Sequence, residues 1–99
     1  MPRYKMTIEY DGTNFCGWQK QKDGVSVQEK LEKALAVFAH ESVEIYGSGR
    51  TDAGVHAYGQ VAHFDLSKEI DTFAAQASFN ALVRPNPIGV LSVEKVADD

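Results

Sequence analysis

The residues best suited to chemistry lie between Gly49 and Ala57, in the run Gly-Arg-Thr-Asp-Ala-Gly-Val-His-Ala. Small residues dominate this run, and they let a ligand approach the backbone closely. In an extended stretch, residues two apart point to the same side, so Arg50 could grip the carboxylate of Asp52. A guanidinium there stabilises the ionised carboxylate, which suits a nucleophile or a base better than a general acid. The alternative interpretation is a surface turn with a local ion pair.

A second segment combines aromatic rings with basic residues. Trp18 follows Phe15, and Lys20 and Lys22 come shortly after it. Aromatic rings stack on nucleic-acid bases and lysines contact phosphates, so this segment could bind RNA. The rings could equally pack beneath the loop that follows the first strand, and both alternatives stay open.

The charge of the chain is unevenly distributed. The net charge is −4, but residues 1–50 carry seven Lys/Arg and seven Asp/Glu, whereas residues 51–99 carry three and seven. A net negative charge argues against binding of nucleic acid by bulk electrostatics alone. A polyanion would have to meet the first half, where the basic residues include Arg3, Lys5, Lys20, Lys22 and Arg50.

Cysteine usage and hydropathy favour a small cytoplasmic domain. Cys16 is the single cysteine, so no internal disulfide forms and a structural zinc site has no second thiolate. No apolar run follows the N-terminus, and no stretch approaches the ~20 apolar residues of a membrane span. We therefore expect one domain over residues 1–99, in the cytoplasm, with no metal site and no membrane contact.

Hydrophobic periodicity predicts the elements that position these residues. Apolar residues alternate along 4–10, which is typical of a strand with one buried face. Ser26, with Glu29 three residues later, has the form of a helix N-cap, and helical spacing continues to Phe38. The predicted strands span 4–10, 43–46, 60–66 and 88–96, and a second helix capped by Asp71 or Thr72 spans 72–83.

The resulting order, β-α-β-β-α-β, is that of the ferredoxin-like fold, an α+β class. Right-handed crossovers place both helices on one face of a four-stranded antiparallel sheet. The other face would be open, or covered by something outside this chain. The fold hosts many functions and does not decide among them.

Five segments of the chain resemble, in order, the tRNA pseudouridine synthase A family. The run 49–57 is similar to the family's active-site motif. The further similarities are Tyr10-Asp11-Gly12-Thr13 with Phe15 and Gly17-Trp18-Gln19, Ser26-Val27-Gln28, Gly59-Gln60-Val61-Ala62-His63-Phe64-Asp65, and Asn80-Ala81-Leu82 with Arg84-Pro85-Asn86-Pro87-Ile88. The similarity as a whole runs from residue 4 to residue 96, and on the combination of these segments the chain is identified as a member of the family.

The resemblance implies an activity and roles for particular residues. Family members isomerise uridine to pseudouridine in the anticodon arm of tRNA, without cofactor or metal. Asp52 matches the essential aspartate, the nucleophile, and Arg50 matches the arginine that pairs with it and helps displace the target base. The residues implied to bind substrate are Gly49, Thr51, His56, Trp18, Gln19 and Lys20, although His56 could instead anchor the loop.

The resemblance also implies a larger assembly. Family members carry a second, related domain, form a cleft between the two domains, and work as homodimers. Their catalytic tyrosine would come from beyond Asp99. We therefore expect this chain to be the N-terminal half of such a protein and nearly inactive alone, with the open sheet face docking the missing C-terminal domain.

Three other functions fit the same topology less well. A non-catalytic RRM-like RNA-binding domain needs aromatic residues on the third strand beside a basic residue, whereas Tyr58–Phe64 has one aromatic in mid-strand and no basic start. An acylphosphatase-like hydrolase needs an arginine after the first strand, and Asp11–Cys16 contains none. A plain regulatory domain would leave the run 49–57 unexplained.

Overall fold

The structure, a computed structural model, describes residues 2–12, 17–18, 26–47 and 57–97. Its helices and strands follow the predicted order. They are β1 (Arg3–Tyr10), α1 (Val27–Ala39), β2 (Tyr46–Gly47), β3 (Ala57–Asp65), α2 (Thr72–Leu82) and β4 (Ile88–Val96).

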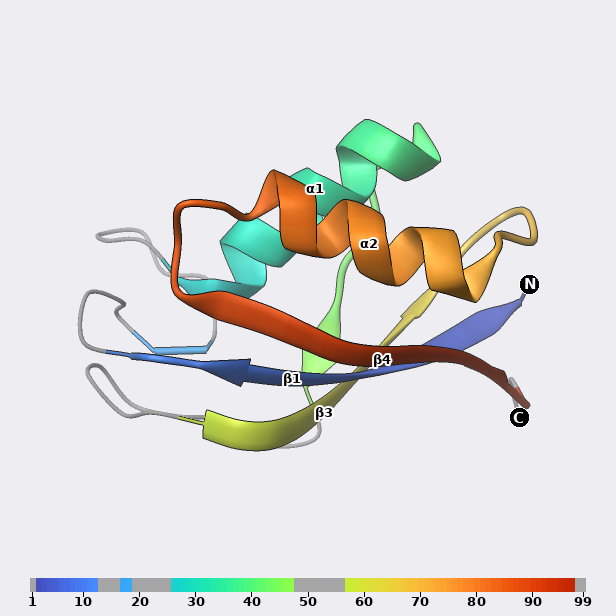
Figure 1. Ribbon diagram of the computed structural model, residues 1–99. Helices are drawn as coiled ribbons and strands as arrows, with labels where there is room; N and C mark the ends of the chain where they lie inside the picture. Colours follow the sequence, from blue (N-terminus) through green and yellow to red (C-terminus); the bar gives the residue numbers. More distant parts are fainter. Residues whose placement is uncertain (1, 13–16, 19–25, 48–56, 98–99) are drawn as a thin grey trace.

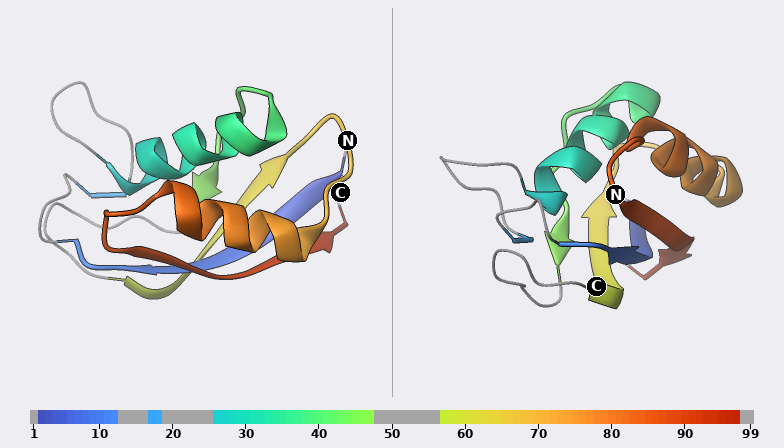
Figure 2. Two further views of the ribbon diagram at one scale, coloured as in Figure 1. Left: turned by 45° about the horizontal axis from the view of Figure 1, so that its top comes forward. Right: turned by 60° about the vertical axis from the view of Figure 1, so that its left-hand side comes forward.

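The strands form one antiparallel sheet in the order β2-β3-β1-β4. Both helices lie side by side on one face of this sheet (Figures 1 and 2). Within the described residues, no helix covers the opposite face. The predicted ferredoxin-like class, including the placement of both helices, is confirmed.

The core lies between the sheet and the helices. Every second residue of β1 is buried and at most 4% exposed, namely Tyr4, Met6, Ile8 and Tyr10. Their neighbours point to the open face, as the alternation predicted. Across the layers, the ring of Phe64 packs edge-on against Phe79 of α2, with centroids 5.9 Å apart.

Each helix begins at a side-chain cap. The Ser26 hydroxyl accepts a hydrogen bond of 3.1 Å from the backbone N–H of Glu29, which confirms the predicted cap of α1. The Asp71 carboxylate accepts from the N–H groups of Phe73 and Ala74, so Asp71 rather than Thr72 caps α2. These bonds satisfy donors that a helix start leaves unpaired.

The largest differences from the predicted strand boundaries are at the starts of β2 and β3. β2 begins at Tyr46 rather than at 43, because side chains of α1 bind both backbone groups of Ile45. β3 begins at Ala57 rather than at 60, and Gly59 lies within it with a φ of 136°. The register passes from Gln60 to Tyr58 across a β-bulge, which interrupts the alternation on which the prediction relied. β4 spans 88–96 as predicted.

Candidate active site

Several connections of the chain meet at one end of the sheet. Tyr10, the last residue of β1, pairs with Ala57 at the start of β3 and with Ile88 at the start of β4. β2 is antiparallel to β3 and therefore runs toward the same end. Figure 1 shows this end of β1 and the turn from α2 to β4 on the side away from both termini. We call it the loop end.

Most predicted site residues lie outside the described residues. These are Gly49, Arg50, Thr51, Asp52 and His56, together with Gln19 and Lys20. The segment 48–56 is joined to the described chain at Gly47 and at Ala57. The structure therefore defines how the flanks of this segment are held.

The flank before the segment is held by α1. The side-chain amide of Gln28 donates a buried hydrogen bond of 2.9 Å to the carbonyl of Ile45. The Glu32 carboxylate accepts a bond of 2.9 Å from the N–H of the same residue. Tyr46 then enters β2 opposite His63, and the two rings stack with centroids 5.3 Å apart. The backbone just before residue 48 is therefore held by α1 on one side and by β3 on the other.

The flank after the segment is held by β1 and by a glycine bulge. Ala57 pairs with Tyr10, and the Tyr10 hydroxyl donates a bond of 2.8 Å to the side-chain carbonyl of Gln60. The φ of 136° at Gly59 lies where side-chain-bearing residues are strained. The bulge turns the strand just after the chain returns from residue 56.

Trp18 is the one predicted substrate-binding residue that the structure describes. Its side chain is 3% exposed and belongs to the core. The carbonyls of Gly17 and Trp18 accept hydrogen bonds of 3.2 and 3.0 Å from the N–H groups of Val27 and Gln28. Residues 17–18 are thereby tied to the start of α1. Burial favours packing of the indole over stacking on an RNA base.

The turn from α2 to β4 forms a third part of the loop end. The N–H of Asp11 donates a bond of 3.0 Å to the carbonyl of Pro87. The side chain of Asn86 donates a bond of 2.7 Å to the carbonyl of Val83, and its N–H donates to the same carbonyl. These bonds fix residues 83–87 against the end of β1.

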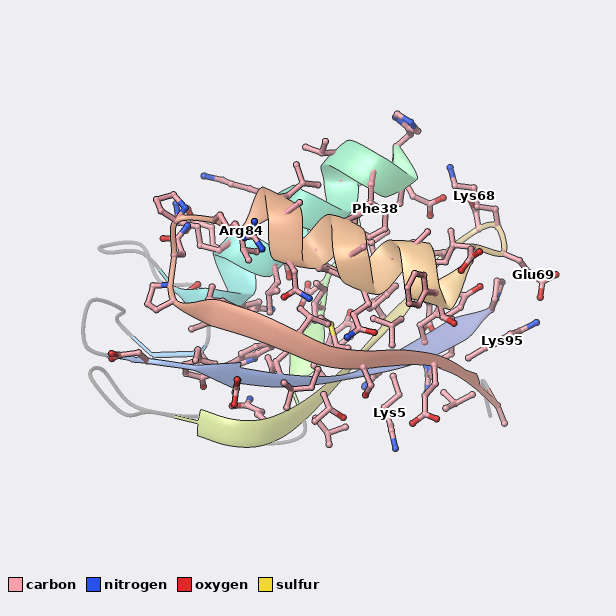
Figure 3. All side chains as sticks on the ribbon, viewed as in Figure 1. Lys5, Phe38, Lys68, Glu69, Arg84 and Lys95 are labelled. Atoms are coloured by element: carbon pink, nitrogen blue, oxygen red, sulfur yellow. The ribbon has the colours of Figure 1, made fainter. Side chains whose placement is uncertain are left out.

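The described carboxylates with shifted pKa values lie away from the loop end. Arg3 donates hydrogen bonds of 2.8 and 3.1 Å to the carboxylate of Asp65, and they lower the pKa of Asp65. A hydrogen bond from Lys95 lowers the pKa of Glu69. Figure 3 shows Lys95 and Glu69 close to one another on the side of the chain termini.

Two of the basic residues expected to meet a polyanion form ion pairs in the structure. Arg3 is bound to Asp65, and Lys5 lies 3.1 Å from the carboxylate of Glu94. These partners lie far along the sequence, so a count of charges does not reveal them.

Gln28 and Gly59 lie within the family-like motifs, but the sequence pattern alone assigned neither of them a structural role. One signal was present for Gln28. It lies three residues before Leu31 and seven before Leu35, on the buried side of the helix, and it is polar. A buried amide requires hydrogen-bond partners, so it indicates a contact with backbone.

Two kinds of feature are absent from the part of the chain that the structure describes. Among these residues, no cluster of three or more His, Cys, Asp or Glu side chains has the arrangement of a metal site. Likewise, no described helix has the length and apolar character needed to span a membrane.

Comparison with known proteins shows what the chain is similar to. A family model described as tRNA pseudouridine synthase matches residues 6–98. The tRNA pseudouridine synthase A of Afipia carboxidovorans is 59% identical over 98 residues, which cover 99% of this chain and 40% of that protein. The protein of the same name from Methylocella silvestris is 56% identical over 99 residues, covering 100% and 40%. That of Ehrlichia chaffeensis is 54% identical over 97 residues, covering 97% and 40%. The chain therefore spans about two fifths of the length of these curated relatives.

Proposed function

Because the chain belongs to the tRNA pseudouridine synthase family, we propose that the polypeptide containing it isomerises uridine to pseudouridine in tRNA. One observation carries the proposal. The family match over residues 6–98 includes the whole run 49–57 together with both of its described flanks. We further propose that the target uridines lie in the anticodon stem-loop.

The reaction breaks the bond between N1 of uracil and C1′ of the ribose. A bond between C5 and C1′ then forms, the hydrogen on C5 is released to solvent, and N1 takes up a proton, so the product is an isomer of uridine. In the proposal, the carboxylate of Asp52 is the nucleophile, and the guanidinium of Arg50 keeps it ionised. Its bond to C1′ of the sugar, or to the base, breaks again by the time the product is released. No cofactor or metal takes part.

The target base must leave the helical stack before it can react, which costs a few kcal/mol. In the proposal, Arg50 helps to displace it, while Gly49, Thr51, His56, Gln19 and Lys20 contact the nucleotide or its neighbours. Such chemistry requires a segment whose ends are held in place. The bonds of Gln28 and Glu32 to Ile45, and the pairing of Ala57 with Tyr10, support this requirement.

We also propose that the rest of the polypeptide, a C-terminal domain, covers the open face of the sheet. The chain spans 40% of the length of its relatives, so most of such a protein lies outside it. The open face carries Tyr46, which is 49% exposed and stacked on His63. On the family resemblance, the full polypeptide works as a homodimer in the cytoplasm.

The test replaces the proposed nucleophile in the full-length polypeptide. Asp52→Ala should abolish release of tritium from tRNA labelled at C5 of uridine, because that hydrogen leaves when C5 bonds to C1′. Binding of the same tRNA in a filter assay should change little. Asp71→Ala, at the exposed cap of α2, is the matched control and should keep full turnover.

Two results would contradict the proposal. Turnover by Asp52→Ala at the wild-type rate would remove Asp52 from the nucleophile role. Tight binding of RNA by the wild-type polypeptide with no tritium release would instead favour the RRM-like, non-catalytic alternative.

A further inference from the structure

The lysines and arginines of the described residues fall into two groups. Those in ion pairs with carboxylates are Arg3, Lys5, Lys33 and Lys95. Within the same described residues, Lys30, Lys68 and Arg84 have no ion pair and no side-chain hydrogen bond, although the charge of Lys68 contributes to the lowered pKa of Glu41. The charges of Lys30 and Arg84 are therefore available to a partner.

Arg84 projects from the loop end. It lies two residues after the end of α2, next to the C-cap Val83, and its side chain is exposed. The turn that carries it is held by the bonds from Asn86 to Val83 and from Asp11 to Pro87. Figure 3 shows Arg84 where α2 runs into this turn, at the opposite end of the molecule from Lys68.

Lys30 lies near the same end on the other helix. It is the fourth residue of α1, which begins at the loop end. Residues two apart on a helix point in nearly opposite directions, so Lys30 points away from Glu32, which binds Ile45. The side of α1 opposite Glu32 carries Phe38, whose ring packs against that of Phe79 in α2, with ring centroids 4.9 Å apart. Lys30 therefore lies on the side of α1 that faces α2.

The two helices run in opposite directions, so the start of α1 and the end of α2 lie at the same end of the helix layer (Figure 2). Lys30 and Arg84 are thus two unpaired cations at the loop end, on the helix side of the sheet. The exposed carboxylate of Asp11 is at this end too, but it follows β1 in the sheet layer. Unpaired basic side chains spaced across a surface fit the phosphates of a nucleic-acid backbone.

We propose that Lys30 and Arg84 bind phosphate groups of the RNA substrate at the loop end. This inference rests on the proposed function. Arg84 would hold one phosphate through two N–H groups, and Lys30 would contact a second as a point charge. Both are substrate-binding residues, and neither takes part in the chemical step.

The test compares Lys30→Gln, Arg84→Gln and the double variant in the full-length polypeptide. The matched control is Lys68→Gln, which removes an unpaired cation at the opposite end. We expect the double variant to raise both Kd and KM for tRNA by about tenfold at moderate salt, with kcat unchanged. The slope of log K against log salt should fall by about 0.7–0.9 for each phosphate that is no longer bound. Arg84→Lys should recover part of the affinity, because a charge is restored.

The outcomes separate this inference from the function on which it rests. An active wild type whose double variant keeps the same Kd, KM and salt slope would overturn the assignment of Lys30 and Arg84 alone. A double variant that loses kcat with Kd and salt slope unchanged would also overturn it, since that pattern indicates a structural role. A wild type that neither binds nor converts tRNA would overturn both proposals.

Discussion

The side-chain amide of Gln28 donates a hydrogen bond of 2.9 Å to the backbone carbonyl of Ile45, inside the core. Gln28 is 5% exposed and Ile45 is fully buried. The Glu32 carboxylate also accepts a hydrogen bond from the N–H of Ile45. Two side chains of α1 thus bind the backbone groups of Ile45 that a neighbouring strand would otherwise bind. The segment that precedes the candidate active-site run is therefore positioned by the first helix.

Gln28→Ala should lower the free energy of unfolding by about 1–3 kcal/mol, because it leaves a buried carbonyl without a partner. Urea denaturation measures this change. Gln76→Ala is the matched control. The Gln76 amide donates to the carbonyls of Val90 and Leu91 near the surface, where water can replace it. Equal destabilisation of the two variants would contradict a special role for the bond to Ile45.

Gly59→Ala should destabilise the chain by about 1–3 kcal/mol, although an added Cβ would meet no atom within 4 Å. The cause is the φ of 136°, which only glycine adopts without strain. Gly89→Ala is the matched control, since its φ is not in the positive region and its Cβ would lie in ordinary contact, 3.4 Å from Cγ of Glu9. Thermal unfolding compares the melting temperatures of the two variants. Similar melting temperatures would refute the proposed backbone strain at residue 59.

The sequence predicted those parts of the fold that depend on local pattern. The alternation along β1, the cap at Ser26 and the bounds of β4 all follow from residues close together in the chain. The start of β2 does not follow from such local pattern, because Ile45 is bound by Gln28, which lies 17 residues before it in the chain. The early start of β3 was missed because a bulge at Gly59 breaks the alternation.

The candidate site divides in the same way. The motif around Asp52 is a local sequence feature and could be recognised without a structure. Which cations are available to a substrate is not local, since Arg3 and its partner Asp65 are 62 residues apart. Burial of Trp18 likewise depends on the start of α1, to which its backbone is bonded. Pairing and burial therefore required the fold.

Stability should fall in acid in part because of Asp65. Its pKa is lowered by the hydrogen bond from Arg3 and by the charge of the same guanidinium. The unfolded state therefore binds more protons in acid, so the contribution is complete above the unfolded pKa of about 3.9 and is lost as pH falls through the folded-state pKa. Both side chains are 33% exposed, so we expect the contribution to be under about 1 kcal/mol.

Asp65→Asn tests this pH dependence directly. The difference in unfolding free energy between wild type and variant should be largest at neutral pH. It should shrink as pH falls through the folded-state pKa of Asp65, below which the aspartic acid is uncharged like the asparagine. Urea denaturation at a series of pH values measures the difference. A gap that stays constant across the series would show that the charge of Asp65 contributes nothing.

The 99-residue chain alone should fold cooperatively yet show no measurable conversion of uridine in an anticodon stem-loop. Folding is expected because the described residues already enclose one continuous core between sheet and helices. Inactivity is expected because the chain spans only 40% of the length of its relatives, and the proposed cleft needs the remainder as its opposite wall. Urea denaturation and tritium release from C5-labelled RNA measure the two properties on one sample.

Adding the separately produced remainder of the polypeptide should restore turnover, and Asp52→Ala in the 99-residue chain should prevent this recovery. Turnover by the isolated chain at the rate of the full-length polypeptide would show that the chain is a complete catalytic unit.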